Sequence, residues 1–270
     1  MQSRPFDFTG YHVFVAGGSS GINLGIAQAF ARAGARLSVI SRSAERVERA
    51  AAGLRELGKD AIGIAADVRQ PNALELAFSK AVEKFGPIDV LVSGAAGNFL
   101  AKALDMSPNA FKTVVDIDLL GSFNVLRLSH AHLRRPGACI IQISASQAFV
   151  ATPYQLHVSA AKAGIDMLTR GLALEWGAEG IRINSIIPGP IQETEGLKRL
   201  APTPETLQAM ADRVPLKRLG RLDDVSRMAM MLASDWGSFV TGTVIPVDGG
   251  LFLTGPRDFS AAAEASRRDR

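Results

Sequence analysis

The stretch that decides the fold is residues 12–23, which read His-Val-Phe-Val-Ala-Gly-Gly-Ser-Ser-Gly-Ile-Asn. An apolar run, 12–16, ends in a turn that holds three glycines and leads into a helical pattern. Glycines allow a tight turn and a close backbone approach, and the start of a helix offers unpaired N–H groups to an anion. Because the turn joins the first strand to the first helix, it favours a pyrophosphate-binding loop over the alternative, an ordinary strand-to-helix turn.

Outward from this loop, short apolar runs alternate with longer helical patterns. The runs lack polar alternation, which is typical of strands buried on both faces. The predicted strands are 12–16, 37–41, 61–65, 90–93, 138–143, 181–187 and 243–247. The predicted helices are 22–33, 44–57, 71–85, 108–133, 160–177 and 222–234. This alternation predicts one α/β domain of the Rossmann type, a doubly wound parallel sheet with helices on both faces.

The domain is expected to span residues 1–258, and residues 259–270, rich in Ala, Arg and Asp, to form a flexible tail. One long interruption, 188–215, contains five prolines and is predicted to lack regular structure. In a doubly wound sheet the ligand crevice lies at the carboxyl ends of the strands. A long segment near such a crevice is often a mobile lid over the substrate.

Composition narrows the class of protein. The 270 residues include 47% apolar residues, enough for a sizeable core, and carry a formal charge of +4. The basic residues are scattered, so no nucleic acid partner is expected. The single cysteine, Cys139, cannot form an internal disulfide, no run is long enough to span a membrane, and no metal site is expected. With no apolar leader and no Ser-Lys-Leu at the end of the sequence, a cytoplasmic location is expected.

The end of the second predicted strand bears on the choice of cofactor. An acidic residue there would accept hydrogen bonds from a ribose 2′-hydroxyl and repel a 2′-phosphate. This chain instead has Ser41, Arg42 and Ser43, followed by Arg46 one helical turn on. A guanidinium can bind a phosphate through two hydrogen bonds, so the sequence predicts NADP(H) rather than NAD(H). The alternative for Arg42 is a solvated surface charge.

The glycine loop resembles that of the short-chain dehydrogenase/reductase family, Thr-Gly-x-x-x-Gly-x-Gly. Ala16 stands in place of the threonine and Asn23 in place of the last glycine. Asp67 fits the family's adenine contact, and the run 93–97, Ser-Gly-Ala-Ala-Gly, stands where the family has Asn-Asn-Ala-Gly. Since asparagine tolerates unusual backbone angles, we expect cofactor binding to survive the change at Asn23.

The catalytic pattern of this family is a tyrosine four residues before a lysine, with a serine and an asparagine upstream. The lysine is present as Lys162, but the other three positions hold Val158, Ala145 and Asp118. Since valine has no proton to exchange, interconversion of carbonyls and alcohols by the usual route is disfavoured. One interpretation is an inactive relative. The other is that Asp118 and Lys162 together bind and orient a water molecule as the proton donor.

This tyrosine-free pattern resembles one branch of the family, the 2,4-dienoyl-CoA reductases, especially the peroxisomal type. The likeness runs from about residue 10 to residue 254. The motifs that carry it lie at 95–100, 107–114, 116–118, 176–177, 181–185, 188–191 and 194–200. It implies NADPH-dependent reduction of a 2,4-dienoyl-CoA in fatty acid β-oxidation, with hydride added at the δ-carbon and a proton supplied through water. The alternatives are another alkene or carbonyl substrate, or an NADPH-binding protein without activity.

The resemblance also implies a role for individual residues and an assembly. The expected catalytic residues are Asp118 and Lys162. The expected cofactor contacts are Gly17, Ser19, Ser20, Gly21, Ile22, Arg42, Ser43, Arg46, Asp67, Val68, Ala95, Lys162, Pro188, Gly189, Ile191 and Thr194. The expected acyl-CoA contacts are Arg69, Phe99, Ser107, Asn109 and Arg199. Surface positions for the two arginines, and core packing for Phe99, are the alternatives. A homotetramer paired through helices 108–133 and 160–177 is expected.

Overall fold

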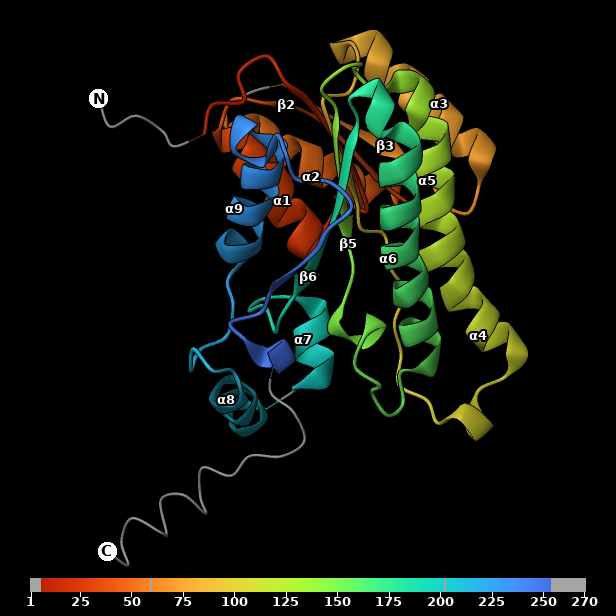
Figure 1. The fold of residues 1–270 in the computed structure, drawn as a ribbon, viewed down its shortest axis with the longest axis vertical. Helices are drawn as coiled ribbons and strands as arrows, with labels where there is room; N and C mark the ends of the chain where they lie inside the picture. Colours follow the sequence, from red (N-terminus) through yellow and green to blue (C-terminus); the bar gives the residue numbers. More distant parts are fainter. Residues whose placement is uncertain (1–5, 59, 202, 254–270) are drawn as a thin grey trace, which may run out of the picture.

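The computed structural model describes residues 6–58, 60–201 and 203–253, and of residues 199 and 200 the backbone alone. Among these residues, seven parallel strands form one sheet with helices on both faces (Figure 1). The predicted single domain of the Rossmann type is therefore confirmed. The expected tail, 259–270, and the expected end of the domain at residue 258 lie outside the described residues.

The strands lie in the order β3-β2-β1-β4-β5-β6-β7, and each neighbouring pair is parallel. Their bounds are β1 His12–Ala16, β2 Arg36–Ser41, β3 Ala61–Ala65, β4 Val90–Ser93, β5 Cys139–Ile143, β6 Arg182–Pro188 and β7 Val244–Val247. Each predicted strand is present, with both ends within one residue of the prediction. The strand order reverses between β1 and β4, and in a doubly wound sheet ligands bind beside such a point, at the carboxyl ends of the strands.

Two helical layers cover the sheet (Figure 1). One layer holds α1 Gly21–Arg32, α2 Ala44–Glu56 and α9 Leu222–Ala233. The other holds α3 Pro71–Phe85, α4 Pro108–Val115, α5 Gly121–Ser129 and α6 Leu156–Trp176. Alternate residues of β1 pack beneath the two helical layers, because successive side chains of a strand point to opposite faces. Val13 and Val15 belong to the core beneath α1 and α9, and Phe14 and Ala16 to the core beneath α3 and α5.

The predicted helix 108–133 is present, but it is not a uniform α-helix. A π-helical turn, Asp116–Leu120, separates α4 from α5, and a 3-10 turn, His130–His132, ends the segment. Such a turn closes its hydrogen bonds over one residue more than an α-helix does, and so changes the direction of the side chains that follow. The spacing of apolar residues did not reveal it.

The prediction that residues 188–215 lack regular structure is wrong. The segment contains two helices, α7 Glu195–Leu200 and α8 Pro204–Arg213. The Thr194 side chain accepts a hydrogen bond at the start of α7, and Pro204 occupies the first turn of α8. A proline in that position loses nothing, since the first N–H groups of a helix have no partner within the helix. Proline here marks a helix start instead of excluding a helix.

Candidate active site

Asp118 lies in the π-helical turn between α4 and α5, a rare element that often occurs at functional sites. Its side chain is fully buried, and Oδ1 accepts a hydrogen bond of 2.7 Å from the backbone N–H of Gly97. Gly97 belongs to the segment that follows β4, so this bond joins the helix to the carboxyl end of the sheet. The other oxygen, Oδ2, has no hydrogen-bond partner among the described residues. The carboxylate is therefore held in one orientation with one oxygen available.

Lys162 comes from α6 and faces the same carboxylate. Its Nζ lies 3.4 Å from Asp118 Oδ2 and donates a hydrogen bond of 3.1 Å to the carbonyl oxygen of Ile143, the last residue of β5. Both side chains are more than nine-tenths buried, and a buried charge is tolerated when an opposite charge compensates it. The structure thus brings together the two residues that were predicted to be catalytic.

The group that most of this family uses for acid–base chemistry has no counterpart beside the pair. Val158, at the tyrosine position, is buried and apolar. Tyr154 is half-exposed ahead of α6, and Tyr11, the other tyrosine of the chain, precedes β1 at the amino end of the sheet. The 3.4 Å between Asp118 Oδ2 and Lys162 Nζ leaves no room for a phenol between them. Among the described residues, Asp118 and Lys162 thus lie together without a tyrosine beside them.

Two further side chains near the pair were not predicted to be functional. His157, interpreted from the sequence as a packing residue, is fully buried, and its ring lies against that of Phe99, tilted by 32°, with 4.2 Å between centroids. Burial lowers the pKa of His157, although Phe99 and Asp118 oppose this shift. Gln155 Nε2 donates a hydrogen bond of 2.9 Å to the carbonyl oxygen of Phe99. His157 and Gln155 hold Phe99 in place. The feature of the sequence that could have indicated this role is a histidine directly before the altered tyrosine position.

The glycine loop has the backbone geometry of an anion cradle. Gly17 (φ 78°) and Gly21 (φ 57°) adopt left-handed conformations that favour glycine. A Cβ on Gly17 would lie 2.9 Å from the Cα of Ala95, so the loop and the segment after β4 approach as closely as two backbones can. The Ser20 side chain makes no capping hydrogen bond, which leaves the first N–H groups of α1 to a ligand. These features fit the pyrophosphate of a dinucleotide.

Positive charge gathers where β2 ends. Arg42 and Arg46 are exposed, and Ser43 Oγ accepts a hydrogen bond of 3.3 Å from the backbone N–H of Arg46 at the start of α2. Two guanidinium groups and the positive end of a helix suit a 2′-phosphate. Beyond β3, Asp67 accepts hydrogen bonds from the guanidinium of Arg69, one of them 2.6 Å long. These bonds lower the pKa of Asp67, with a smaller contribution from Arg42. One predicted cofactor contact and one predicted acyl-CoA contact thus form an ion pair.

Three more of the predicted cofactor contacts lie near the glycine loop and after β3. Ser19 and Ile22 are half-buried within the loop and the first turn of α1. Val68 is buried, and its carbonyl oxygen accepts a hydrogen bond of 3.0 Å from Asn124 of α5. This bond links the segment after β3 to the helix that follows the π-helical turn.

The predicted contacts after β6 border the same end of the sheet. Pro188 is the last residue of β6, and a Cβ on Gly189 would lie 2.6 Å from the Cα of Asp248, so glycine is required by the close approach. Ile191 and Thr194 are buried, and Thr194 Oγ1 donates a hydrogen bond of 2.9 Å to the carbonyl oxygen of Ile191. This segment leads directly into α7.

Three of the five predicted acyl-CoA contacts lie on one exposed stretch that runs from the end of β4 into the first turn of α4. Phe99 is 37% exposed, and Ser107 and Asn109 are exposed as well. Ser107 Oγ accepts a hydrogen bond of 3.1 Å from the N–H of Ala110 and so caps α4. The backbone of Arg199 belongs to α7, but its side chain lies outside the described residues.

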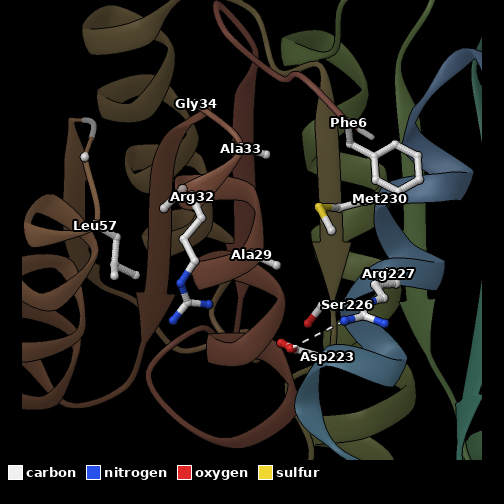
Figure 2. Close-up of a pocket in the computed structure, with 12 residues that line it drawn as sticks. Phe6, Ala29, Arg32, Ala33, Gly34, Leu57, Asp223, Ser226, Arg227 and Met230 are labelled. Atoms are coloured by element: carbon white, nitrogen blue, oxygen red, sulfur yellow. Dashed lines mark ion pairs between the residues drawn. The ribbon is translucent and has the colours of Figure 1, made fainter. Parts of the chain in front are cut away.

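Two hollows within the described part of the molecule lie apart from the Asp118–Lys162 pair. One, of about 560 Å³, borders the predicted cofactor segment 189–191. The other, of about 790 Å³, lies between α1 and α9, with the ion pair of Asp223 and Arg227 at its wall (Figure 2). The glycine loop, Asp118 and Lys162 line neither of these two hollows.

Other features bear on the class of protein. Within residues 6–253, apart from the two that are left out, no helix combines the length and the apolar character that crossing a membrane requires. Nor do three or more His, Cys, Asp or Glu side chains come together there as a metal would need. Cys139 is buried in β5, and burial raises the pKa of its thiol to about 11, which makes it an unreactive part of the core.

Comparison with known proteins adds independent evidence. A family model described as Enoyl-(Acyl carrier protein) reductase matches residues 16–252. The chain is 44% identical over 256 residues to the peroxisomal 2,4-dienoyl-CoA reductase SPS19 of Saccharomyces cerevisiae, which covers 93% of this chain and 87% of the relative. It is 35% identical over 244 residues to a protein of Bacillus subtilis named as a 2,4-dienoyl-CoA reductase, with 89% and 96% covered. The structure of the RhlG/NADP complex of Pseudomonas aeruginosa matches with a TM-score of 0.86 at 28% identity, and the match covers 93% of this chain and 100% of the RhlG chain.

The cytoplasmic location predicted from the sequence is wrong by this comparison. The yeast relative, and relatives at 43% and 40% identity from Pongo abelii and Arabidopsis thaliana, are named peroxisomal enzymes. The prediction failed for a physical reason. A lone cysteine excludes an internal disulfide but does not distinguish one reducing compartment from another. A targeting signal is recognised by a receptor and is not a property of the fold.

The fold, the site and the comparisons agree. The sheet order and the glycine loop after β1 are those of a dinucleotide-binding domain, and the family model covers most of the chain. Relatives at 40–44% identity over 93–94% of the chain are named 2,4-dienoyl-CoA reductases. The protein is an oxidoreductase, and its chain belongs to the short-chain dehydrogenase/reductase family.

Proposed function

We propose that the protein reduces a 2,4-dienoyl-CoA with NADPH as the reductant. The observation that carries this proposal is the buried pair of Asp118 and Lys162, 3.4 Å apart, with Val158 where most of the family has tyrosine. The names of the relatives support the same reaction. Conjugate reduction does not need a phenol, because the proton is delivered to carbon and can come through water.

The chemistry places definite demands on the site. When bound, NADPH supplies a hydride that adds to the δ-carbon of the thioester. The electrons of the diene then shift to the thioester oxygen, where each well-placed N–H donor contributes about 3 kcal/mol. Protonation at Cα leaves a 3-enoyl-CoA, the product type in the name of the yeast relative, whereas protonation at Cγ would give the 2-enoyl-CoA in the name of the Bacillus relative. We propose the 3-enoyl product, given the higher identity to the yeast enzyme.

Asp118 and Lys162 share the delivery of the proton. The N–H of Gly97 fixes Asp118 Oδ1, so Oδ2 is directed to the ammonium of Lys162. A water molecule held by these two groups donates a proton to Cα. Lys162 returns a proton to the resulting hydroxide, and the amine regains its own proton from solvent. In this scheme the lysine is the acid and the aspartate orients the water.

The acyl-CoA is proposed to enter over the exposed stretch that carries Phe99, Ser107 and Asn109. Phe99, held by His157 and Gln155, would contact the acyl chain. The Arg69 side chain is 39% exposed and would face the CoA phosphates beside its ion pair with Asp67. The segment 188–194 and α7, to which Arg199 belongs, would close over the nicotinamide and the substrate.

The cofactor choice can be tested at Arg42. Arg42→Ala removes a guanidinium from the start of α2, and we expect the KM for NADPH to rise at least about tenfold while the KM for NADH stays within about twofold. The matched control is Arg49→Ala, on an exposed face of the same helix and paired with Glu45. Equal losses for both cofactors would show that Arg42 does not read the 2′-phosphate.

The reaction itself is tested by following NADPH absorbance with a small panel of thioesters. We expect oxidation of NADPH with a 2,4-dienoyl-CoA and none with a 3-ketoacyl-CoA of the same chain length. Chromatography of the product would identify the position of the remaining double bond. Turnover on the ketone but not on the diene would assign another reductase activity. Binding of NADPH without turnover on any thioester would favour a protein that has lost catalysis.

A homotetramer is proposed from the exposed apolar residues on the helices that were expected to pair. Leu120 and Phe123 lie at or beside α5, and Met167 and Leu174 lie on α6, with Leu174 87% exposed. Exposing large apolar side chains to water is unfavourable, and a second subunit that covers them removes this cost. We expect light scattering to give a tetramer for the native chain and a smaller species for Phe123→Glu combined with Leu174→Glu. Leu104→Glu, fully exposed outside these helices, is the control. A native monomer would contradict the proposal.

A further inference from the structure

Two unusual positions of the sequence meet in the structure. Asn23 lies in the first turn of α1, where the glycine loop of the family has its last glycine, and Gly94 follows β4 directly. They are 71 residues apart, and Asn23 Nδ2 donates a hydrogen bond of 2.8 Å to the carbonyl oxygen of Gly94. Asn23 is 7% exposed, so this contact is made inside the protein.

The orientation of the Asn23 amide follows from its neighbours. Nδ2 faces two backbone carbonyl oxygens, that of Gly94 and that of Gly17 at 3.4 Å. Carbonyl oxygens accept hydrogen bonds and do not donate them, so the NH₂ group must be on this side. Oδ1 therefore lies on the other side, where it is buried and has no hydrogen-bond partner among the described residues.

The side chain of Asn23, as it is placed, leaves no space for a Cβ at position 94. A Cβ on Gly94 would lie 2.3 Å from Asn23 Oδ1 and 2.6 Å from Nδ2, distances that real Cβ atoms do not reach. The backbone of Gly94 gives no separate reason, since it is absent from the glycines with positive φ. The side chain of Asn23 thus fills the space that a residue with a Cβ would occupy at position 94.

We infer that Asn23 and Gly94 form a matched pair that positions the two walls of the cofactor cradle. One wall is the loop that contains Gly17, and the other is the segment 94–97. Three residues beyond Gly94, the N–H of Gly97 donates a hydrogen bond to the carboxylate of Asp118. The pair therefore also positions the segment that orients the catalytic aspartate. The inference rests on cofactor binding in the proposed function but not on the identity of the acyl substrate.

A double-mutant cycle tests the pair through the Kd for NADPH, measured by fluorescence, and the Tm of the cofactor-free protein. Gly94→Ala is expected to raise the Kd at least about tenfold in the native chain, since the added methyl expels the Asn23 side chain. In the Asn23→Gly background, the same change is expected to alter the Kd by less than about twofold. Gly53→Ala, at an exposed glycine of α2 with open space around it, is the matched control and should match the native Kd.

Asn23→Gly creates no clash and is informative by itself. It removes the hydrogen bond between the two walls, and we expect the Kd for NADPH to rise about threefold to tenfold. An unchanged Kd for this variant would overturn the inference. An equal effect of Gly94→Ala on the Kd in both backgrounds would also overturn it. Coupling in the Tm with none in the Kd would do so as well, because the two residues would then pack together without positioning the cofactor cradle.

These outcomes remain distinct from the failure of the proposed function. A native chain that binds NADPH but reduces no dienoyl-CoA would refute the substrate and leave the cycle intact. A native chain that binds no NADPH would refute the proposed function and the positioning role together. In that case coupling in the Tm would still show the packing, which separates an error about the cofactor from an error about the pair.

Discussion

The Asp118→Asn variant is expected to lose about 100-fold to 1000-fold of its turnover on a 2,4-dienoyl-CoA while its Kd for NADPH stays within about twofold of the native value. The amide has the shape of the carboxylate, and its oxygen can still accept the 2.7 Å hydrogen bond from Gly97. The negative charge 3.4 Å from Lys162 is lost, and with it the acceptor that orients the water. Steady-state kinetics and NADPH fluorescence measure the two quantities separately.

The surface of the same helix provides the control for this experiment. Asp116 lies in the same π-helical turn, and its carboxylate pairs with Lys112 at 2.5 Å on a more exposed side. Asp116→Asn is expected to keep turnover within about twofold, because an exposed pair of this kind contributes little. Removing one partner of a buried pair costs about 3–5 kcal/mol of stability, so the assay temperature must lie below the Tm of Asp118→Asn. Native turnover in that variant would exclude Asp118 from the mechanism.

Lys162→Met is expected to lower kcat by a similar factor and, unlike Asp118→Asn, to raise the KM for NADPH about tenfold. Methionine fills much of the volume of lysine but removes the ammonium, and with it the contacts to Asp118 and to the carbonyl oxygen of Ile143. The resemblance to the family implies that this lysine also holds the nicotinamide ribose. Loss of both roles therefore affects the cofactor and the proton together, as a full kinetic analysis with varied NADPH would show.

The double variant tests whether the two residues act as a unit. If they hold one water together, Asp118→Asn combined with Lys162→Met is expected to cost about as much in kcat as either change alone. Effects that multiply would indicate two independent roles. Lys112→Met is the matched control for the lysine, since Lys112 pairs with Asp116 and its side chain is 68% exposed. A kcat near the native value in Lys162→Met would contradict the proposed acid.

Local patterns were sufficient for the strands, but not for every helix or for the break within the long helix 108–133. Strands buried on both faces read as apolar runs, so β1 to β7 were located within one residue. The π-helical turn Asp116–Leu120 was missed because one turn of different hydrogen bonding leaves the apolar spacing almost unchanged. The helices α7 and α8 were missed because prolines were interpreted as breaks, whereas Pro204 occupies a helix start.

For the site, the resemblance to the family pointed to Asp118 and Lys162, because Asp118 stands where the family has asparagine, Lys162 is retained, and Val158 stands at the tyrosine position. The bond from Gly97 to Asp118 and the contact of Asn23 with Gly94 were not predictable. Each joins residues more than 20 positions apart, and their distances depend on how β4, α1 and the long helix pack.

By itself, the sequence determined the class of fold and the glycine loop, because these follow from periodicity and from chemistry at short range. Its resemblance to the family singled out the two charged residues. Only the tertiary structure decided that the two charges meet at 3.4 Å, which oxygen of Asp118 has no hydrogen-bond partner, and that the Asn23 side chain fills the space beside position 94. Those properties are set by burial and by contacts between segments that are distant along the chain, and such contacts exist only once the sheet and its two helical layers have formed.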